Sequence, residues 1–221
     1  SDAAIVPTVM AGLCAGGMVS HQNDSPSTAS RPFDRHRDGG ILSEGSGMVI
    51  LENLSHAMAR GARPILEIIG FGSAADPANE ESGAGLASCI REALDNATIY
   101  THGVDGLCAH GPSDPVLDRV ETQAVKAVLG NHARRIPVFS IKGVTGNPMA
   151  AGGAHQIVTS GLIVQTGQIP PTANYQYPDP DCDLDIVHSH PRCNRLKHLL
   201  INAHGSGRTN SAMIVRAFDI S

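Results

Sequence analysis

The sequence predicts an α/β fold in which a buried sheet is layered with helices. Short apolar runs alternate along the chain with runs of helical length, a pattern typical of buried strands in layered α/β proteins. Glycine clusters follow several of these apolar runs, at 110–111, 145–146 and 204–207. Functional residues of open α/β sheets gather where strands end, and glycine lets the backbone approach a ligand closely. These three loops are therefore the predicted site.

The first 62 residues predict two helices and one strand. Residues 5–18 are small and apolar, which indicates a helix that ends at the polar, turn-forming run 21–32. A helix this apolar needs partners on more than one face, and we expect them upstream of Ser1. Residues 45–52 form a short apolar run that predicts a buried strand, and residues 54–60 predict the helix after it.

The rest of the chain predicts a regular alternation of strands and helices. Close backbone packing is expected, because aromatic residues make up only 3% of the chain while 24 glycines are present. One helix shows a buried stripe that includes Ile90, Ala93 and Leu94. The predicted strands are 64–71, 104–109, 137–141, 199–202 and 212–217, and the predicted helices are 83–97, 120–129 and 150–164.

Bulk properties exclude several classes of protein. A net charge of -5 and a pI near 6.1 provide no cationic field for nucleic acid. No run approaches the roughly 20 apolar residues of a membrane span, and the N-terminus lacks the pattern of a signal peptide, so a cytoplasmic location is expected. The five cysteines are widely spaced and form no CxxC, which fits reduced thiols better than disulfides or a zinc site.

Ordered blocks of residues cover nearly the whole chain. The opening signature is Arg-Pro-Phe-Asp at 31–34, followed by Asp-Gly-Gly at 38–40 and Glu-Gly-Ser-Gly at 44–47. Seven further blocks follow at 104–111, 121–126, 140–142, 145–146, 170–174, 178–185 and 202–210. In sequence and in order, this set resembles the elongating β-ketoacyl-acyl-carrier-protein synthases. An ordered set is far more specific than any one block.

The resemblance implies the layered α-β-α-β-α fold of the thiolase-like superfamily, which is built from two similar halves. Residues 1–62 would be the end of the N-terminal ketosynthase half, and residues 63–221 the C-terminal ketosynthase domain. The implied enzyme is an acyltransferase that condenses a malonyl thioester with an acyl group, in fatty acid or polyketide biosynthesis. By resemblance, the nucleophilic cysteine that carries the acyl group lies upstream of Ser1, outside this chain.

The resemblance assigns stabilisation of the enolate to His110 and Asn147. Decarboxylation leaves negative charge on the thioester oxygen, and hydrogen-bond donors aimed at that oxygen lower the barrier. The family uses two histidines, of which His110 matches the first, whereas Asn147 stands at the second. An amide can still donate, as in related condensing enzymes with a Cys, His, Asn set. The alternatives are that Asn147 marks lost catalysis, as in chain-length factors, and that His110 is a core histidine at a strand end.

Lys142 matches the family lysine, whose ammonium helps to set the protonation state of the nearby histidine. Gln156 stands at the position of the family glutamate, which removes a negative charge and leaves a buried Lys142 in need of another acceptor. Glu121 lies in a matched block and is the predicted acceptor. A structural, exposed lysine is the alternative for Lys142.

Two loops depart from the family at positions that hold the substrate. The family's histidine loop carries two threonines that hold the carrier's phosphopantetheine arm, and these are Pro112 and Asp114 here. The aromatic gate of the C-terminal glycine loop is replaced, because that loop reads Gly205-Ser206-Gly207. A backbone N–H of the loop would still complete the oxyanion hole, and we expect an ungated or differently shaped acyl tunnel.

The implied partners are an acyl carrier protein, the N-terminal ketosynthase segment and a second subunit, in a homodimer or a ketosynthase/chain-length-factor heterodimer. No cofactor is expected, because phosphopantetheine enters on the carrier protein. The alternative function is a non-catalytic, chain-length-factor-like subunit that pairs with an active ketosynthase.

Two weaker patterns have simpler interpretations. One is a possible metal site near the C-terminus, made of His188, His190, Cys193 and His198; a solvated loop explains it better, so no metal is expected. The other is a possible docking patch for an acidic carrier protein, and ordinary surface arginines explain most of it. Its members are Arg60, Arg63, Arg134, Arg135, Arg192 and Arg195.

Overall fold

The computed structural model describes residues 1–77 and 82–218. The α-helices are α1 (Pro7–Ala15), α2 (Leu54–Ala59), α3 (Ala84–Ala97), α4 (Pro115–Leu129), α5 (Lys142–Thr145) and α6 (Gly152–Thr166). The strands are β1 (Leu66–Ala75), β2 (Gly106–Cys108), β3 (Pro137–Phe139), β4 (Gln168–Ile169), β5 (Asp185–Ile186), β6 (Arg192–Cys193), β7 (His198–Gly205) and β8 (Thr209–Ala217).

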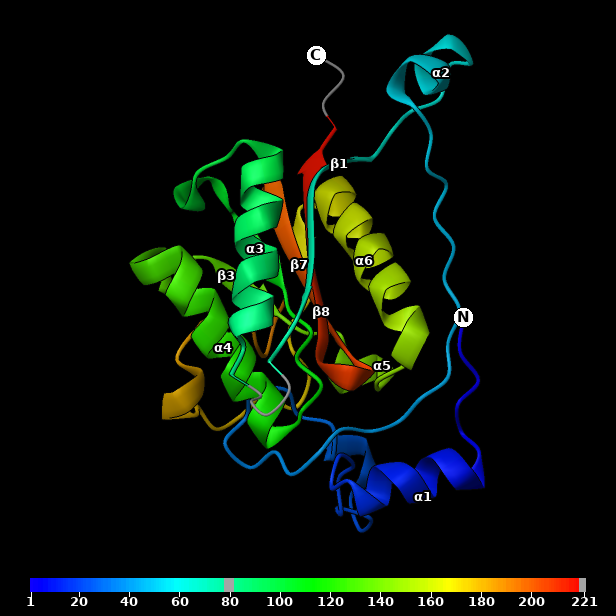
Figure 1. Cartoon of the computed structure of the whole chain (residues 1–221), viewed down its shortest axis with the longest axis vertical. Helices are drawn as coiled ribbons and strands as arrows, with labels where there is room; N and C mark the ends of the chain where they lie inside the picture. The colour runs from blue at the N-terminus through cyan, green and yellow to red at the C-terminus, as the bar shows by residue number, and fades with distance from the viewer. Residues whose placement is uncertain (78–81, 219–221) are drawn as a thin grey trace.

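A mixed, six-stranded sheet forms the centre of the molecule, in the order β1-β8-β7-β2-β3-β5. Figure 1 shows α3 and α4 on one face of this sheet and α6 on the other. Strand β8 is antiparallel to both of its neighbours, β1 and β7, whereas β7, β2, β3 and β5 run parallel to one another. The carboxyl ends of β2, β3 and β7 therefore lie at one edge, as the sequence-based α/β prediction requires.

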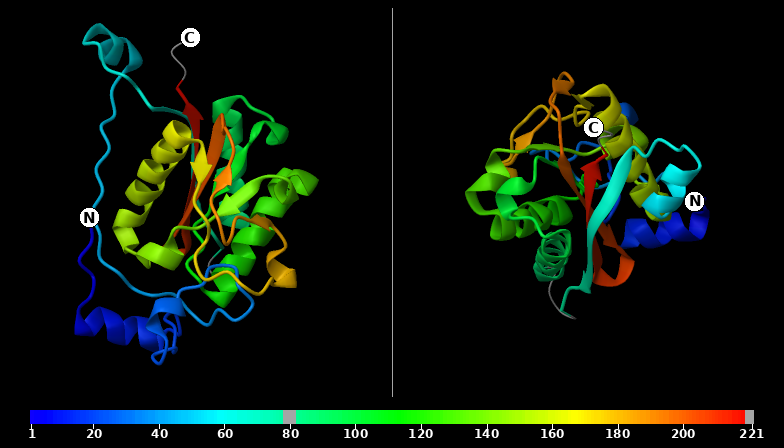
Figure 2. Two further views of the ribbon diagram at one scale, coloured as in Figure 1. Left: turned by 180° about the vertical axis from the view of Figure 1, so that it is seen from behind. Right: turned by 90° about the horizontal axis from the view of Figure 1, so that it is seen from above.

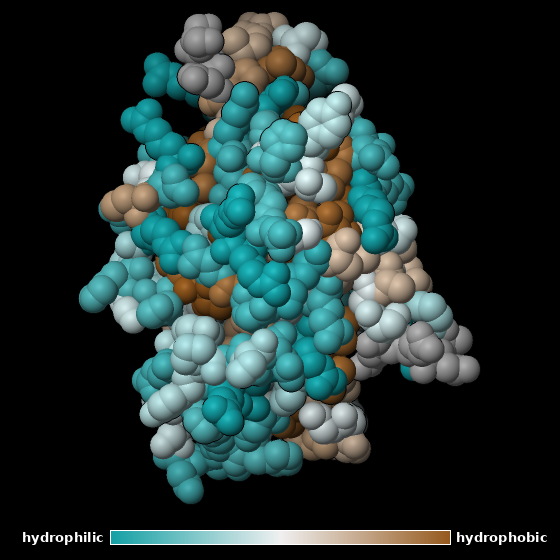
Figure 3. All heavy atoms as spheres, turned by 90° about the vertical axis from the view of Figure 1, so that its left-hand side faces the viewer, coloured by the Kyte–Doolittle hydropathy of each residue, from teal (hydrophilic) through white to brown (hydrophobic). Residues whose placement is uncertain are grey.

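Helices α3 and α4 cover their face of the sheet with amphipathic sides. Ile90 and Ala93 of α3 are fully buried, and Leu94 is nearly so, which confirms the predicted stripe. Figure 3 shows that the outward side of this layer is mostly hydrophilic, with apolar residues visible only in gaps between polar ones. The pattern of the sequence is thus satisfied by one buried face and one solvated face.

Helix α4 begins five residues before the predicted start at residue 120. The Asp114 side chain accepts hydrogen bonds from the backbone N–H groups of Val116 and Leu117, at 2.8 and 2.9 Å. Pro115 occupies the first helical position, where its missing N–H costs nothing. An N-cap followed by proline is a strong start signal, and it places this helix directly after the loop that holds His110.

The strand predicted at residues 45–52 is wrong. Within the described ranges, the backbone of this segment pairs with another segment only at Gly45, which bridges to Asp2. Met48, Ile50 and Leu51 are 87%, 81% and 70% exposed. A run of apolar residues becomes a strand only when a neighbouring strand takes up its N–H and C=O groups, and here residues 41–65 run outside α6 towards α2 (Figures 1 and 2).

Helix α1 is shorter than predicted and buries none of its residues. It lies at the end of the molecule opposite α2, as Figures 1 and 2 show. Among residues 1–77 and 82–218, no helix has the length and apolar character needed to cross a lipid bilayer.

Helix α3 packs so closely on β1 that two strand positions admit only glycine. A Cβ atom at Gly70 would lie 2.0 Å from the carbonyl oxygen of Ala93, and one at Gly72 would lie 2.2 Å from that of Cys89. Backbone atoms cannot move aside as the end of a flexible side chain can. This contact is the close backbone packing that the glycine-rich composition predicts.

Gly72→Ala is expected to lower the free energy of unfolding by about 1–3 kcal/mol, because the new methyl group overlaps the Cys89 carbonyl and separates α3 from β1. Gly153→Ala in α6 is the matched control, since no atom lies within 4 Å of a Cβ built there. It is expected to leave stability unchanged or to raise it by about 0.5–1 kcal/mol. Urea unfolding followed by circular dichroism measures both, and equal effects would contradict the packing argument.

Candidate active site

The candidate site lies at the edge of the sheet where β2, β3 and β7 end. His110 follows β2, Lys142 opens α5 after β3, and His204 is the penultimate residue of β7. Figure 1 places α5 beside the turn of the β7–β8 hairpin. Three segments far apart in the sequence thus bring two imidazoles and one amine together.

Lys142 and His110 form the central contact of the site. Lys142 Nζ lies 2.9 Å from His110 Nδ1 and 2.6 Å from the His110 backbone oxygen. An ammonium group has donors only, so Nδ1 accepts and the neutral ring carries its proton on Nε2. The lysine therefore fixes the tautomer in which Nε2–H is a hydrogen-bond donor.

Burial keeps this pair in that state near neutral pH. Desolvation, together with the positive charge of Lys142 and the nearby His204, holds the pKa of His110 well below its ordinary value. Burial also lowers the pKa of Lys142 to about 8, although the negative charge of Glu121 acts in the opposite direction. At neutral pH, a neutral imidazole thus faces a mostly protonated lysine.

The predicted direct pairing of Glu121 with Lys142 is not what the structure shows. The buried carboxylate of Glu121 accepts the backbone N–H groups of His110 and Gly111, both at 2.9 Å. It also accepts the side-chain N–H of Asn202 at 3.1 Å. Because both oxygens are engaged by these donors, Glu121 acts on Lys142 only through its field, while it fixes the backbone of the histidine loop.

Gln156 links the end of β2 to β7. Its Nε2 atom donates to the backbone oxygens of Cys108, Ala109 and Asn202, at 3.3, 3.0 and 3.0 Å. Cys108 and Ala109 lie at the end of β2 and Asn202 lies within β7, two residues before His204, so these carbonyls belong to the segments that carry the two histidines of the site. An ionised glutamate has no donor for them, so glutamine here supports the site by hydrogen bonding.

Asn147 is held by the N-terminal segment. Its backbone N–H donates to Ile41 at 2.7 Å, and its backbone oxygen accepts from Ser43 at 3.1 Å. Within the described residues its side-chain amide makes no hydrogen bond. The structure joins His110 directly to Lys142 and His204, whereas Asn147 lies on the loop that follows α5.

The two substituted positions of the histidine loop have local structural uses. Asp114 caps α4, and the backbone oxygen of Pro112 lies close to Gly40, where a Cβ atom would approach it to 2.9 Å. Between them, Ser113 has a left-handed φ of 73° and accepts the backbone N–H of Arg31 at 2.9 Å. The histidine loop therefore packs against the N-terminal segment.

The predicted oxyanion loop forms the turn between β7 and β8. Gly205 ends β7, Ser206 begins a short 3-10 turn, and Gly207 adopts a left-handed φ of 74°. All three residues are exposed. The turn starts next to His204, so it borders the cluster around His110.

The Arg-Pro-Phe-Asp block at 31–34 and the residue before it contact the segments that carry the site. The ring of Phe33 is fully buried and so close to Gly111 that a Cβ there would lie 2.8 Å from it. The Phe33 N–H donates to Asp118 at 2.7 Å, and Ser30 Oγ donates to the backbone oxygen of Lys142 at 2.7 Å. Phe33 of this block thus packs against the loop of His110, and Ser30, just before the block, holds the backbone at Lys142.

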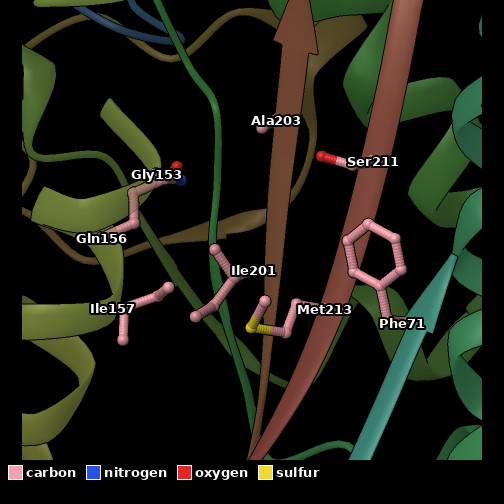
Figure 4. A pocket seen from close by; sticks show the side chains of 8 residues that line it. All are labelled: Phe71, Gly153, Gln156, Ile157, Ile201, Ala203, Ser211 and Met213. Carbon is pink, nitrogen blue, oxygen red and sulfur yellow. The ribbon is translucent and has the colours of Figure 1, made fainter. Parts of the chain in front are cut away.

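A shallow hollow lies on the other side of Gln156, between α6 and the β1–β8–β7 part of the sheet (Figure 4). Its lining consists of Phe71, Gly153, Gln156, Ile157, Ile201, Ala203, Ser211 and Met213. No side chain in this lining is ionisable, so acid–base chemistry in this region belongs to the cluster around His110.

The cysteines are all free thiols. Burial raises the pKa values of Cys108 and Cys182 to about 12 and also raises that of Cys89. Such thiols stay protonated at neutral pH and are poor nucleophiles. Cys14 and Cys193 are exposed.

Within the part of the chain that the structure describes, no three His, Cys, Asp or Glu side chains are grouped closely enough to hold a metal ion. Of the histidines considered for such a site, His198 instead bonds through Nδ1 to the Gly103 carbonyl at 2.9 Å.

Sequence reasoning missed His204. The rings of His204 and His110 meet edge to face, with centroids 5.2 Å apart. The available signal was a polar residue at the end of an apolar strand, directly before a glycine turn.

Comparisons with known proteins identify the family of the chain. The family model of the β-ketoacyl synthase C-terminal domain matches residues 67–176, and that of the N-terminal domain matches residues 1–57. The chain is 37% identical over 224 residues to 3-oxoacyl-(acyl-carrier-protein) synthase 2 of Coxiella burnetii, covering 99% of this chain and 54% of the relative. It is 39% identical over 219 residues to the tetracenomycin polyketide synthase ketoacyl synthase alpha subunit of Streptomyces glaucescens, covering 97% and 51%.

Solved structures share the fold over nearly the whole chain. AntDE:AntF, described as a type II PKS acyl-carrier protein in complex with its ketosynthase bound to the hexaketide, matches with a TM-score of 0.95 and 35% identity, covering 99% of this chain and 55% of that one. The ishigamide ketosynthase/chain length factor matches with a TM-score of 0.90 and 30% identity, covering 99% and 53%. The chain spans about half the length of the relatives it matches. It belongs to the β-ketoacyl synthase family.

Proposed function

We propose that this chain is the C-terminal part of a β-ketoacyl synthase that forms carbon–carbon bonds by decarboxylative Claisen condensation, in fatty acid or polyketide synthesis. The observation that carries the proposal is the contact of Lys142 Nζ with His110 Nδ1 at 2.9 Å. This contact leaves His110 neutral with a donor at Nε2, which is the state that an oxyanion needs.

The proposed reaction uses that donor in its first step. The bond between the malonyl carboxylate and the α-carbon breaks, CO₂ leaves, and the electron pair forms an enolate with negative charge on the thioester oxygen. His110 Nε2–H donates to this oxygen, and Asn147 and a backbone N–H of the turn at Gly205 to Gly207 are proposed to assist. The enolate carbon then attacks the acyl thioester carbonyl, and a cysteine thiolate leaves. That cysteine is proposed to lie outside residues 1–221.

The remaining part of the proposed enzyme would cover the apolar surface that this chain exposes. Met48, Ile50 and Leu51 are largely exposed, as is half of the Phe71 side chain. We propose that residues 1–62 complete an N-terminal half that packs here, and that residues 63–221 form the second half. A cytoplasmic location, a carrier protein that brings the phosphopantetheine arm, and a homodimer or heterodimer are parts of the same proposal; no cofactor of its own is included.

A chain-length-factor-like subunit is the second candidate function. The observation that favours it is the change of three positions that the resemblance links to substrate, at Pro112, Asp114 and Asn147. The similarity to the solved ishigamide ketosynthase/chain length factor supports this candidate. The residue at the nucleophile position of the whole gene separates the two: cysteine supports the enzyme, and glutamine supports the subunit.

His110→Ala in the complete protein is expected to slow decarboxylation of a malonyl-carrier substrate by about 10²–10³-fold, the usual effect of removing one oxyanion donor. His188→Ala is the control, because this exposed ring contacts Tyr175 and hydrogen-bonds to the neighbouring Ser189, away from the cluster around His110, and it should leave the rate unchanged. Release of CO₂ measures the rate. A wild-type rate in His110→Ala would remove His110 from the reaction.

The decarboxylation rate is also expected to fall as pH rises through about 8. Burial lowers the pKa of Lys142 to about 8, so above that pH the lysine loses the charge that favours donation to His110 Nδ1. Lys142→Arg keeps a positive charge across this range, so this decline should disappear even if the variant is slower. A pH–rate profile with the same decline in both proteins would assign it to another group.

A further inference from the structure

His204 is an ionisable residue of the site to which the proposed reaction gives no role. Its ring packs edge to face on that of His110, with centroids 5.2 Å apart. Burial lowers the pKa of His204 and the charge of Lys142 adds to that shift, while the charges of Glu121 and Asp76 and an interaction with the Asn210 side chain oppose it. A neutral ring therefore stands beside His110, on a different segment of the chain.

The Nε2 atom of His204 is shielded from solvent and has no hydrogen-bond partner among the described residues. A buried polar atom without a partner costs free energy, and most such atoms in folded proteins are paired. The contrast with His110 is clear, because its Nδ1 is satisfied by Lys142. The side-chain oxygen of Asn210, the cross-strand partner of His204, is also unpaired, and a ligand oxygen beside His110 would be a second place for the ring to form a hydrogen bond.

The distance between the rings suits a shared acceptor. Two nitrogen donors that bind one oxygen, each at about 2.9 Å, lie at most about 5.8 Å apart. The ring centroids of His110 and His204 are 5.2 Å apart, so the two imidazoles are direct neighbours, and the proposal requires their Nε2 atoms to lie within this limit when substrate is bound. Gln156 maintains this spacing, since it bonds to the carbonyls of Ala109 and Asn202, near each histidine.

We propose that His204 is a second catalytic imidazole, which donates its Nε2–H to the malonyl thioester oxygen beside His110. This inference rests on the proposed condensing function. It means that the chain supplies from the end of β7 the imidazole that position 147 lacks. Two ring N–H donors then stabilise the enolate oxygen, one from the loop after β2 and one from β7.

The test uses His204→Phe in the complete protein, which keeps an aromatic ring against His110 and removes both ring nitrogens. The kcat for malonyl-carrier decarboxylation is expected to fall by about 10²-fold with KM little changed, while the thermal midpoint stays close to that of the wild type. His204→Gln, which restores an N–H donor, should recover part of the loss. His190→Phe, on an exposed loop, is the matched control and should keep the wild-type kcat.

A wild-type kcat in His204→Phe would overturn the proposal. So would a large loss in Asn147→Ala with none in His204→Phe, because the second donor would then be the amide. Failure of the proposed function has a different signature, since His110→Ala would then decarboxylate as fast as the wild type.

A binding measurement decides the role of His204 independently of turnover. The complete protein with ¹⁵N-labelled histidine is titrated with a malonyl-carrier analogue in which an amide replaces the thioester. The Nε2–H signals of both His110 and His204 are expected to shift on binding. A shift confined to His110, or no shift at all, would overturn the proposal, whether or not the protein decarboxylates the natural substrate.

Discussion

The contact between a buried ammonium and a buried imidazole is the interaction on which the rest of the site depends. Lys142 is 3% exposed and His110 7%, so neither can rely on water, and an unpaired charge there would be costly. The buried ammonium of Lys142 donates hydrogen bonds to two acceptors on a single residue, the ring nitrogen and the backbone oxygen of His110. One contact thus satisfies the charge, selects the tautomer and orients the ring.

The surrounding residues complete the electrostatic balance without a direct ion pair. Glu121 is buried and carries the opposite charge, but its oxygens are occupied by backbone and amide donors. Its negative charge therefore stabilises Lys142 from a distance while its hydrogen bonds shape the loop of His110. The substitutions at 114 and 156 fit this environment, since each side chain makes the bonds that its position offers. The substituted side chains therefore take part in the hydrogen bonding around the site.

The sequence was sufficient to predict the fold and most of its elements because the apolar periodicity is strong where the core lies. It failed where the outcome depends on partners. Residues 45–52 have the composition of a strand but no ladder beyond Gly45, and composition does not report whether a neighbour is present. The early start of α4 was readable from Asp114 and Pro115, but the search for apolar periodicity overlooked that cap.

The site was predictable only as far as the family motifs extend. His110 and Lys142 lie in matched blocks, and the structure brings them into contact. His204 lies in the matched block 202–210, but the resemblance gave it no role, so only three-dimensional proximity singles it out. The partner of Lys142 was predicted wrongly because matching of charges favours Glu121. In the structure the Glu121 carboxylate instead accepts backbone N–H groups, and a sequence does not indicate which backbone groups will be near a side chain.

The three hydrogen bonds of Gln156 are insensitive to pH and to salt. Because the amide is uncharged at every pH, the spacing between the strand ends that bear the two imidazoles does not titrate and is not weakened by salt. A carboxyl group in its place would hold those carbonyls only as the protonated acid, and the separation of the rings would then change with acidity. The hydrogen bonds of Gln156 that position the two histidines therefore do not depend on the protonation state of any side chain.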